Sequence, residues 1–96
     1  MEIDEDLVRD TLFGLLRSSS MEPQPDWISV RVLRQPGTPL VRTYVVVIKY
    51  PAARDVLLPE LDEVTGTRQE AGRETGVWVL TSEEAERLCR RQAGGA

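Results

Sequence analysis

The sequence predicts a single small α+β domain, a two-layer sandwich in which an antiparallel sheet of three or more strands packs against N- and C-terminal helices. Three observations predict it: helical periodicity at both ends of the chain, β-branched runs in the middle, and a length of 96 residues, enough for one core. Neither helix can bury its apolar face alone, so we expect both on the same side of the sheet. The predicted order is helix, strand, strand, loop, strand, helix.

The first helix is predicted over about residues 4–17. Leu7, Leu12 and Leu16 recur at the spacing of one helical face. Acidic residues occupy its first turn and a basic residue its last, as the helix dipole favours. The serines at 18–20 end the helix, and the prolines that follow predict an extended linker.

Two strands come next and are expected to form a hairpin. Residues 27–34 alternate, so that Ile28 and Val30 face the core. Residues 35–39 contain Pro-Gly, which suits the centre of a type II turn. Residues 41–50 carry the strongest β signal, and their continuous apolar centre predicts a middle strand.

The segment 51–76 gives the weakest pattern. From Pro51 the chain fits either a short helical turn that ends at Pro59 or an extended segment that packs on the core. Residues 62–75 are polar and rich in glycine, so we expect there a long mobile loop or a weak hairpin around Thr65-Gly66.

The last unit is a short strand over residues 77–80 followed by a helix. Thr81 and Glu84 have the spacing of a capping box, in which each side chain bonds the other residue's backbone N–H. Leu80 and Ala85 occupy the flanking hydrophobic-staple positions, and the glycines at 94 and 95 end the helix.

Composition excludes several classes of enzyme. The chain has no histidine, so Ser-His-acid and Cys-His sites and His-bearing zinc sites are ruled out. No glycine-rich phosphate loop is present either. We therefore predict no enzymatic activity, no cofactor, no metal and no small-molecule substrate.

Cysteine usage and the N-terminus bear on the compartment. Cys89 is the single cysteine, so no intramolecular disulfide forms, and its helix position favours a small buried side chain over a reactive thiol. The acidic start is unlike a signal peptide, and no apolar run is long enough to cross a bilayer. These features predict a cytoplasmic protein that does not bind membranes.

Charge is unevenly distributed along a chain of net charge −4. Residues 27–54 contain five basic residues and no acidic one, so this basic hairpin could bind single-stranded nucleic acid or could simply be solvated. The acidic helix start and the cluster at 55–63 could instead mimic nucleic acid, as phage inhibitors of nucleic-acid enzymes do. The simpler explanation is complementation of the helix dipole for the helix start and a solvated loop for the second cluster.

The favoured hypothesis is a small protein-binding module: an inhibitor, adaptor or accessory subunit that acts through a sheet edge and the 62–75 loop. Another protein is the expected partner, with nucleic acid as the alternative. Trp78 would anchor the interface if it is exposed, and would be core if it is buried. The candidate partner-binding residues are Trp78, Arg31, Arg42, Tyr44, Asp62 and Glu63.

Overall fold

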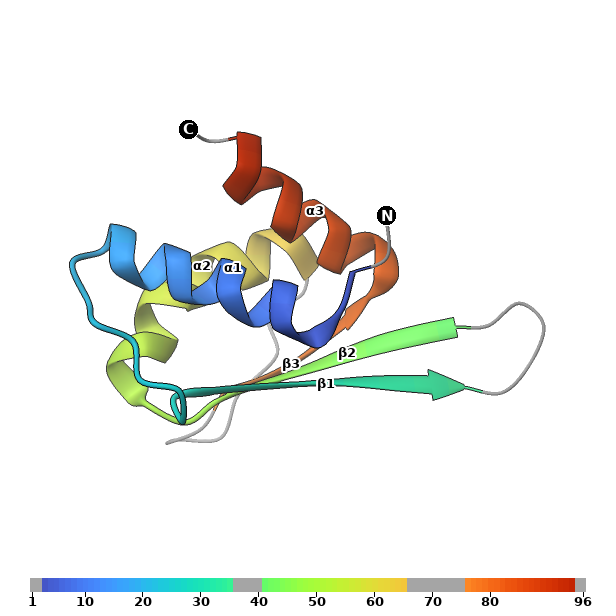
Figure 1. The fold of residues 1–96 in the computed structure, drawn as a ribbon, viewed down its shortest axis with the longest axis horizontal. Helices are drawn as coiled ribbons and strands as arrows, with labels where there is room; N and C mark the ends of the chain where they lie inside the picture. Colours follow the sequence, from blue (N-terminus) through green and yellow to red (C-terminus); the bar gives the residue numbers. More distant parts are fainter. Residues whose placement is uncertain (1–2, 36–40, 66–75, 95–96) are drawn as a thin grey trace.

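The computed structural model describes residues 3–35, 41–65 and 76–94. These form α1 (Glu5–Ser18), β1 (Ile28–Gln35), β2 (Val41–Ile48), α2 (Pro51–Thr65), β3 (Gly76–Thr81) and α3 (Ser82–Gly94). All three helices lie over one face of the antiparallel sheet (Figure 1). The predicted α+β sandwich, with both terminal helices on the same side, is therefore confirmed.

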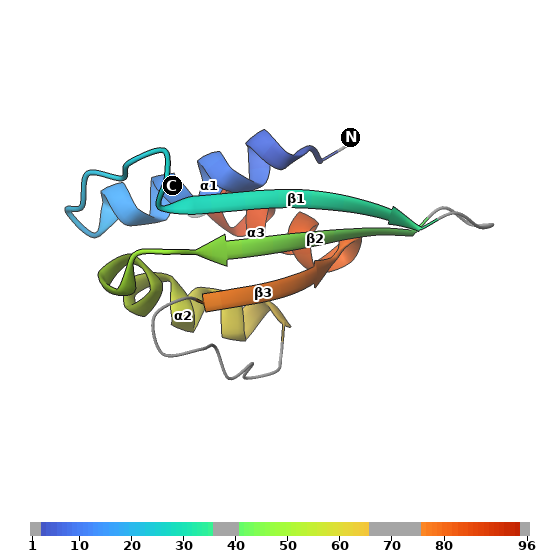
Figure 2. The ribbon, with the colours of Figure 1, turned by 90° about the horizontal axis from the view of Figure 1, so that it is seen from below.

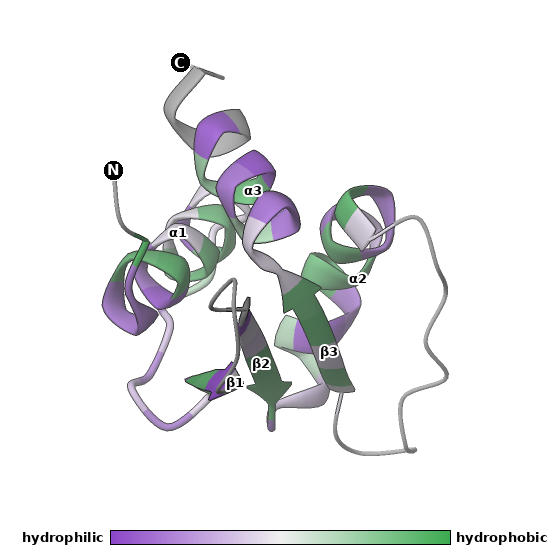
Figure 3. Cartoon of the chain, turned by 90° about the vertical axis from the view of Figure 1, so that its right-hand side faces the viewer, coloured by the Kyte–Doolittle hydropathy of each residue, from purple (hydrophilic) through white to green (hydrophobic). Residues whose placement is uncertain are grey.

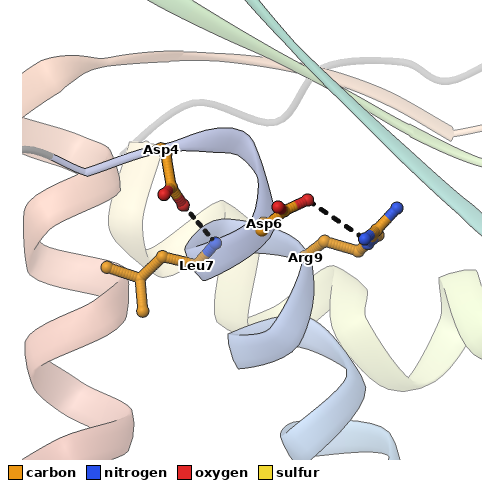
Figure 4. Close-up of polar contacts among 4 residues, drawn as sticks. All are labelled: Asp4, Asp6, Leu7 and Arg9. Atoms are coloured by element: carbon orange, nitrogen blue, oxygen red, sulfur yellow. Dashed lines mark hydrogen bonds and ion pairs between the residues drawn. The ribbon is translucent and has the colours of Figure 1, made fainter.

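Helix α1 begins and ends where the sequence indicates. Asp4 is its N-cap, and a carboxylate oxygen of Asp4 accepts a hydrogen bond of 2.8 Å from the Leu7 backbone N–H (Figure 4). Leu12 and Leu16 are fully buried against the sheet and the other helices. The helix is followed by Ser20 at φ 63°, a left-handed conformation that turns the chain toward β1.

The sheet has the order β1-β2-β3, and both pairs are antiparallel. Val46 of β2 pairs with Val30 on one side and with Trp78 on the other, which fixes the register of all three strands. The predicted hairpin and the predicted central position of β2 are confirmed. The predicted turn at 36–39 lies outside the described residues.

Helix α2 corrects the prediction for residues 51–65. Pro51 does start a helix, but the helix continues through Pro59 to Thr65, so the prediction that Pro59 ends it is wrong. The predicted loop is likewise wrong over residues 62–65, and its remainder, 66–75, lies outside the described residues. The helix is stabilised by four apolar side chains that lie on one helical face, before and after Pro59, and are buried in the core: Ala53, Leu57, Leu61 and Val64.

The junction of β3 with α3 is a closed capping box, as predicted. The Glu84 N–H donates to the Thr81 hydroxyl at 3.2 Å, and the Thr81 N–H donates to the Glu84 carboxylate at 2.8 Å. Leu80 and Ala85 on either side of this cap are fully buried. The chain therefore turns directly from the sheet into the helix layer, where α3 contacts α1 and α2.

Candidate functional site

The face of the sheet opposite the helices is not covered by them. On β3, Gly76, Trp78 and Leu80 are buried under the helices, while Val77 and Val79 on the other side are 40% and 43% exposed. Leu33 of β1 lies on the same side and is 53% exposed. Figure 2 views the sheet from this side, where none of the three helices covers it.

The residues of this surface follow from the strand pairing, because side chains alternate between the two faces. Cross-strand partners lie on the same face, which gives three rows across the sheet. We term this set the open face: Ser29, Val47 and Val77; Arg31, Val45 and Val79; Leu33, Thr43 and Thr81.

The open face is apolar at its centre and carries a positive charge. Val45 and Val47 are half-buried between their neighbours, and Figure 3 shows β2 and β3 in the colours of hydrophobic residues. Arg31 is exposed in the middle row. None of the three strands contains an acidic residue.

Two of the predicted site residues lie in the core instead of on a surface. Trp78 is fully buried, and its indole N–H lies 3.5 Å from a carboxylate oxygen of Asp62. Tyr44 is 2% exposed, and its hydroxyl donates a hydrogen bond of 2.7 Å to the Ile3 carbonyl. Both aromatic rings therefore serve the fold and offer no surface to a partner.

The other predicted site residues are dispersed. Arg31 alone lies on the open face. Arg42 is half-buried near the N-terminus of α1, whereas Asp62 and Glu63 lie on α2. The structure thus does not bring these residues together into one site.

A hollow of about 250 Å³ lies where the start of α1 meets the ends of β1 and β2. It carries both signs of charge, and its carboxylates have structural roles: Asp4 caps α1, and Glu5 accepts a hydrogen bond of 3.0 Å from the Val32 N–H. The hollow is lined by Ile3, Asp4, Glu5, Asp6, Val32, Arg34 and Arg42.

The basic hairpin does not form one continuous basic surface. Arg31 lies on the open face, whereas Arg34 lines the hollow on the helix side. Trp27 and Tyr50 stack on each other, with ring centroids 4.2 Å apart. Tyr44 lies in the core and offers no ring to a base, whereas Tyr50, which stacks on Trp27, remains 41% exposed.

Reactive groups are few in the part of the chain that the structure describes. Cys89 is half-buried beside α1, where its sulfur lies 3.5 Å from the Thr11 hydroxyl. No group of three or more Cys, Asp or Glu side chains within residues 3–35, 41–65 and 76–94 is arranged to hold a metal ion. In the same ranges no helix has the length and apolarity needed to span a membrane.

Sequence reasoning missed the apolar residues of the open face, Val45, Val47, Val77, Val79 and Leu33. The apolar runs at 45–48 and 77–80 were a signal for most of them, but a continuous apolar run does not tell which of its side chains the helices cover. Comparisons with protein-family models, with curated proteins and with solved structures found no match to this chain.

Proposed function

We propose that this chain is a non-enzymatic protein-binding module, of the kind that serves as an inhibitor, adaptor or accessory subunit, and that the open face is its binding surface. The observation that carries the proposal is the exposure of Leu33, Val77 and Val79 together on one side of the sheet. These side chains share one uncovered face with Val45 and Val47, and a partner packed on that face would remove all of them from water. We place the protein in the cytoplasm, where a single cysteine stays reduced.

The charge of the open face defines the chemistry of the partner. Arg31 lies in its middle row and the exposed Lys49 follows β2 at its end, while the strands carry no carboxylate. A partner that presents apolar side chains flanked by Asp and Glu satisfies both the apolar surface and the two cations.

The size of the open face favours one helix as the occupant. Three strands about 4.8 Å apart, with six residues at about 3.3 Å each, make a surface of roughly 14 by 20 Å. That is well below the roughly 800 Å² per partner of a stable dimer interface, so stacking of two copies through this face alone is disfavoured. An α-helix of about three to four turns covers the same length. The proposed occupant is an amphipathic helix of another protein, with acidic residues beside its apolar stripe.

The proposal is tested by quantitative capture from nuclease-treated lysate, followed by pairwise binding of each captured protein in purified form. The chain is compared with Val45→Glu and Arg31→Glu, and with Arg87→Glu on the exposed side of α3 as the matched control. We expect Val45→Glu to weaken the purified complex at least about tenfold, because it places a charge in the apolar centre of the interface. Arg31→Glu should weaken it less and in a salt-dependent way.

The control variant should bind like the unchanged chain, and circular dichroism should show all three variants folded. A complex that tolerates Val45→Glu would exclude the open face as the binding surface. Binding that disappears after nuclease treatment would favour the basic hairpin and nucleic acid. Binding through the acidic segments would instead be lost on changing Asp55 or Glu63, and would leave Arg31→Glu without effect.

A further inference from the structure

The two edges of the sheet differ in how far their backbone groups are already bonded. Strands β1 and β3 are both edge strands, because β2 lies between them. An edge strand exposes unpaired N–H and C=O groups, which other strands can bind unless the protein protects them. A comparison of the two edges therefore indicates which one is free for a partner.

Hydrogen bonds along the sheet show which residues point outward at each edge. In an antiparallel pair, alternate residues direct their backbone groups toward and away from the neighbouring strand. The Val32 N–H donates to the Glu5 carboxylate, so it points away from β2. The Lys49 N–H donates to the Trp27 carbonyl at 2.8 Å, so Trp27, an odd number of residues from Val32, points toward β2 as the alternation requires. The pairing of β1 with β2 and of β2 with β3 extends this alternation to β3. There the N–H and C=O groups of Val77 and Val79 point away from β2.

The edge at β1 is protected. The Glu5 carboxylate already accepts from the outward N–H of Val32, in the middle of the strand. Two arginines, Arg31 and Arg34, add charge to the same strand, which opposes pairing with a further strand.

Within residues 3–35, 41–65 and 76–94, nothing protects the edge at β3 in this way. The strand Gly-Val-Trp-Val-Leu-Thr contains no proline and no charged side chain. Among the described residues, only the Thr81 N–H is taken, by Glu84, and no partner bonds the N–H of Val77 or Val79. We propose that β3 takes up a single extended strand of another protein, which pairs antiparallel with Val77 and Val79.

The surroundings of β3 favour one added strand over a second copy of the chain. Figures 2 and 3 show α2 along β3, on the side away from β1. This helix carries four carboxylates against one guanidinium, from Arg54. Two copies paired through β3 would bring two such acidic helices together, whereas a lone strand brings no helix.

The added strand should be apolar and basic at alternate positions. Its residues opposite Val77 and Val79 share the open face with them, where Val, Ile or Leu continues the apolar surface. Its intervening residues face the side of α2, where Lys or Arg complements the acidic helix. This inference concerns the edge and does not depend on the partner proposed for the open face.

The probe is an end-capped synthetic peptide in which Val and Lys alternate over about eight residues, and the readout is amide hydrogen exchange by NMR. In antiparallel pairing, the valine amides of the peptide point to β3 and the lysine amides point away. We expect the peptide to slow exchange at Val77 and Val79 by about tenfold or more, because their amides gain an acceptor. A peptide N-methylated at lysine should act in the same way, and one N-methylated at valine should have no effect.

Two variants of the protein complete the test. Val79→Pro removes the outward N–H of residue 79 without removing a bond to β2, and should abolish the protection of the Val77 amide by the peptide. Val79→Thr keeps the outward N–H and should retain that protection. Unchanged exchange at millimolar peptide, or equal protection by both N-methylated peptides, would overturn the proposal. Protection without peptide, together with a doubled molar mass, would identify a second copy as the occupant and overturn it as well. Val45→Glu should leave the protection intact, which separates this inference from the open-face proposal.

Discussion

Gly76 and Trp78 pack against each other on the helix-covered face of β3. A Cβ built on Gly76 would lie 2.2 and 2.4 Å from two carbons of the indole ring and 3.0 Å from Cγ of Arg54. Distances this short do not occur between real side chains, so the buried indole occupies the space of a side chain at position 76. The Trp78 indole can therefore pack in this position only because residue 76 has no side chain.

Gly76→Ala should destabilise the protein by about 1–3 kcal/mol, the usual cost of overpacking a closed core. Urea unfolding measures this free energy, with a double-mutant cycle against Trp78→Phe as the control. The phenyl ring lacks the two carbons that the new methyl group would meet, so the alanine should cost less in that background. An alanine variant as stable as the unchanged chain would contradict the packing described for Trp78.

At the scale of elements, the sequence predicted best those features that depend on residues close together in the chain. The capping box at Thr81 and Glu84 depends only on residues three apart, and the hairpin depends on two adjacent runs of β-branched residues joined by a turn sequence. The continuation of α2 past Pro59 was not predicted, because proline lacks an N–H and is a strong reason to end a helix. The buried stripe at Ala53, Leu57 and Leu61 has helical spacing across the proline, but its stabilising effect comes from packing on β2, β3 and α3.

The proline in α2 gives a prediction at this scale. Pro59→Ala should stabilise the protein by about 2 kcal/mol, because alanine restores a helical N–H and removes the ring from the turn before it, with a partial offset from the unfolded chain. The side chain is exposed, so no core contact is lost. Thermal and urea unfolding measure the gain.

The matched control is Pro51→Ala at the first position of the same helix. Proline is well suited to that position, so its loss should leave stability unchanged or lower it by no more than about 1 kcal/mol. If Pro59→Ala lowers stability, the proline must contribute to the bend or position of α2. The expectation that proline destabilises the interior of this helix would then be wrong.

At the scale of the whole molecule, the surface for a partner depends on which side of the sheet the helices cover. The central strand β2 is apolar at consecutive positions, so its sequence does not distinguish its two faces. Pairing with Trp78 and Val30 puts Val46 on the covered side and Val45 on the open side. The candidate site could not be predicted from the sequence because this long-range register, and not any local pattern, divides core from surface.

Neighbouring valines of β2 therefore provide a direct test of the two-layer arrangement. Val46 is fully buried, so Val46→Thr places a hydroxyl among apolar groups and should cost about 1–3 kcal/mol. Val45→Thr keeps the β-branched shape on the open face, and should change stability by no more than about 0.5 kcal/mol. Urea unfolding of the two variants side by side measures the difference, since they share strand, residue type and substitution. Equal costs would mean that a further layer covers the open face in solution, and would leave no free surface there for an amphipathic helix.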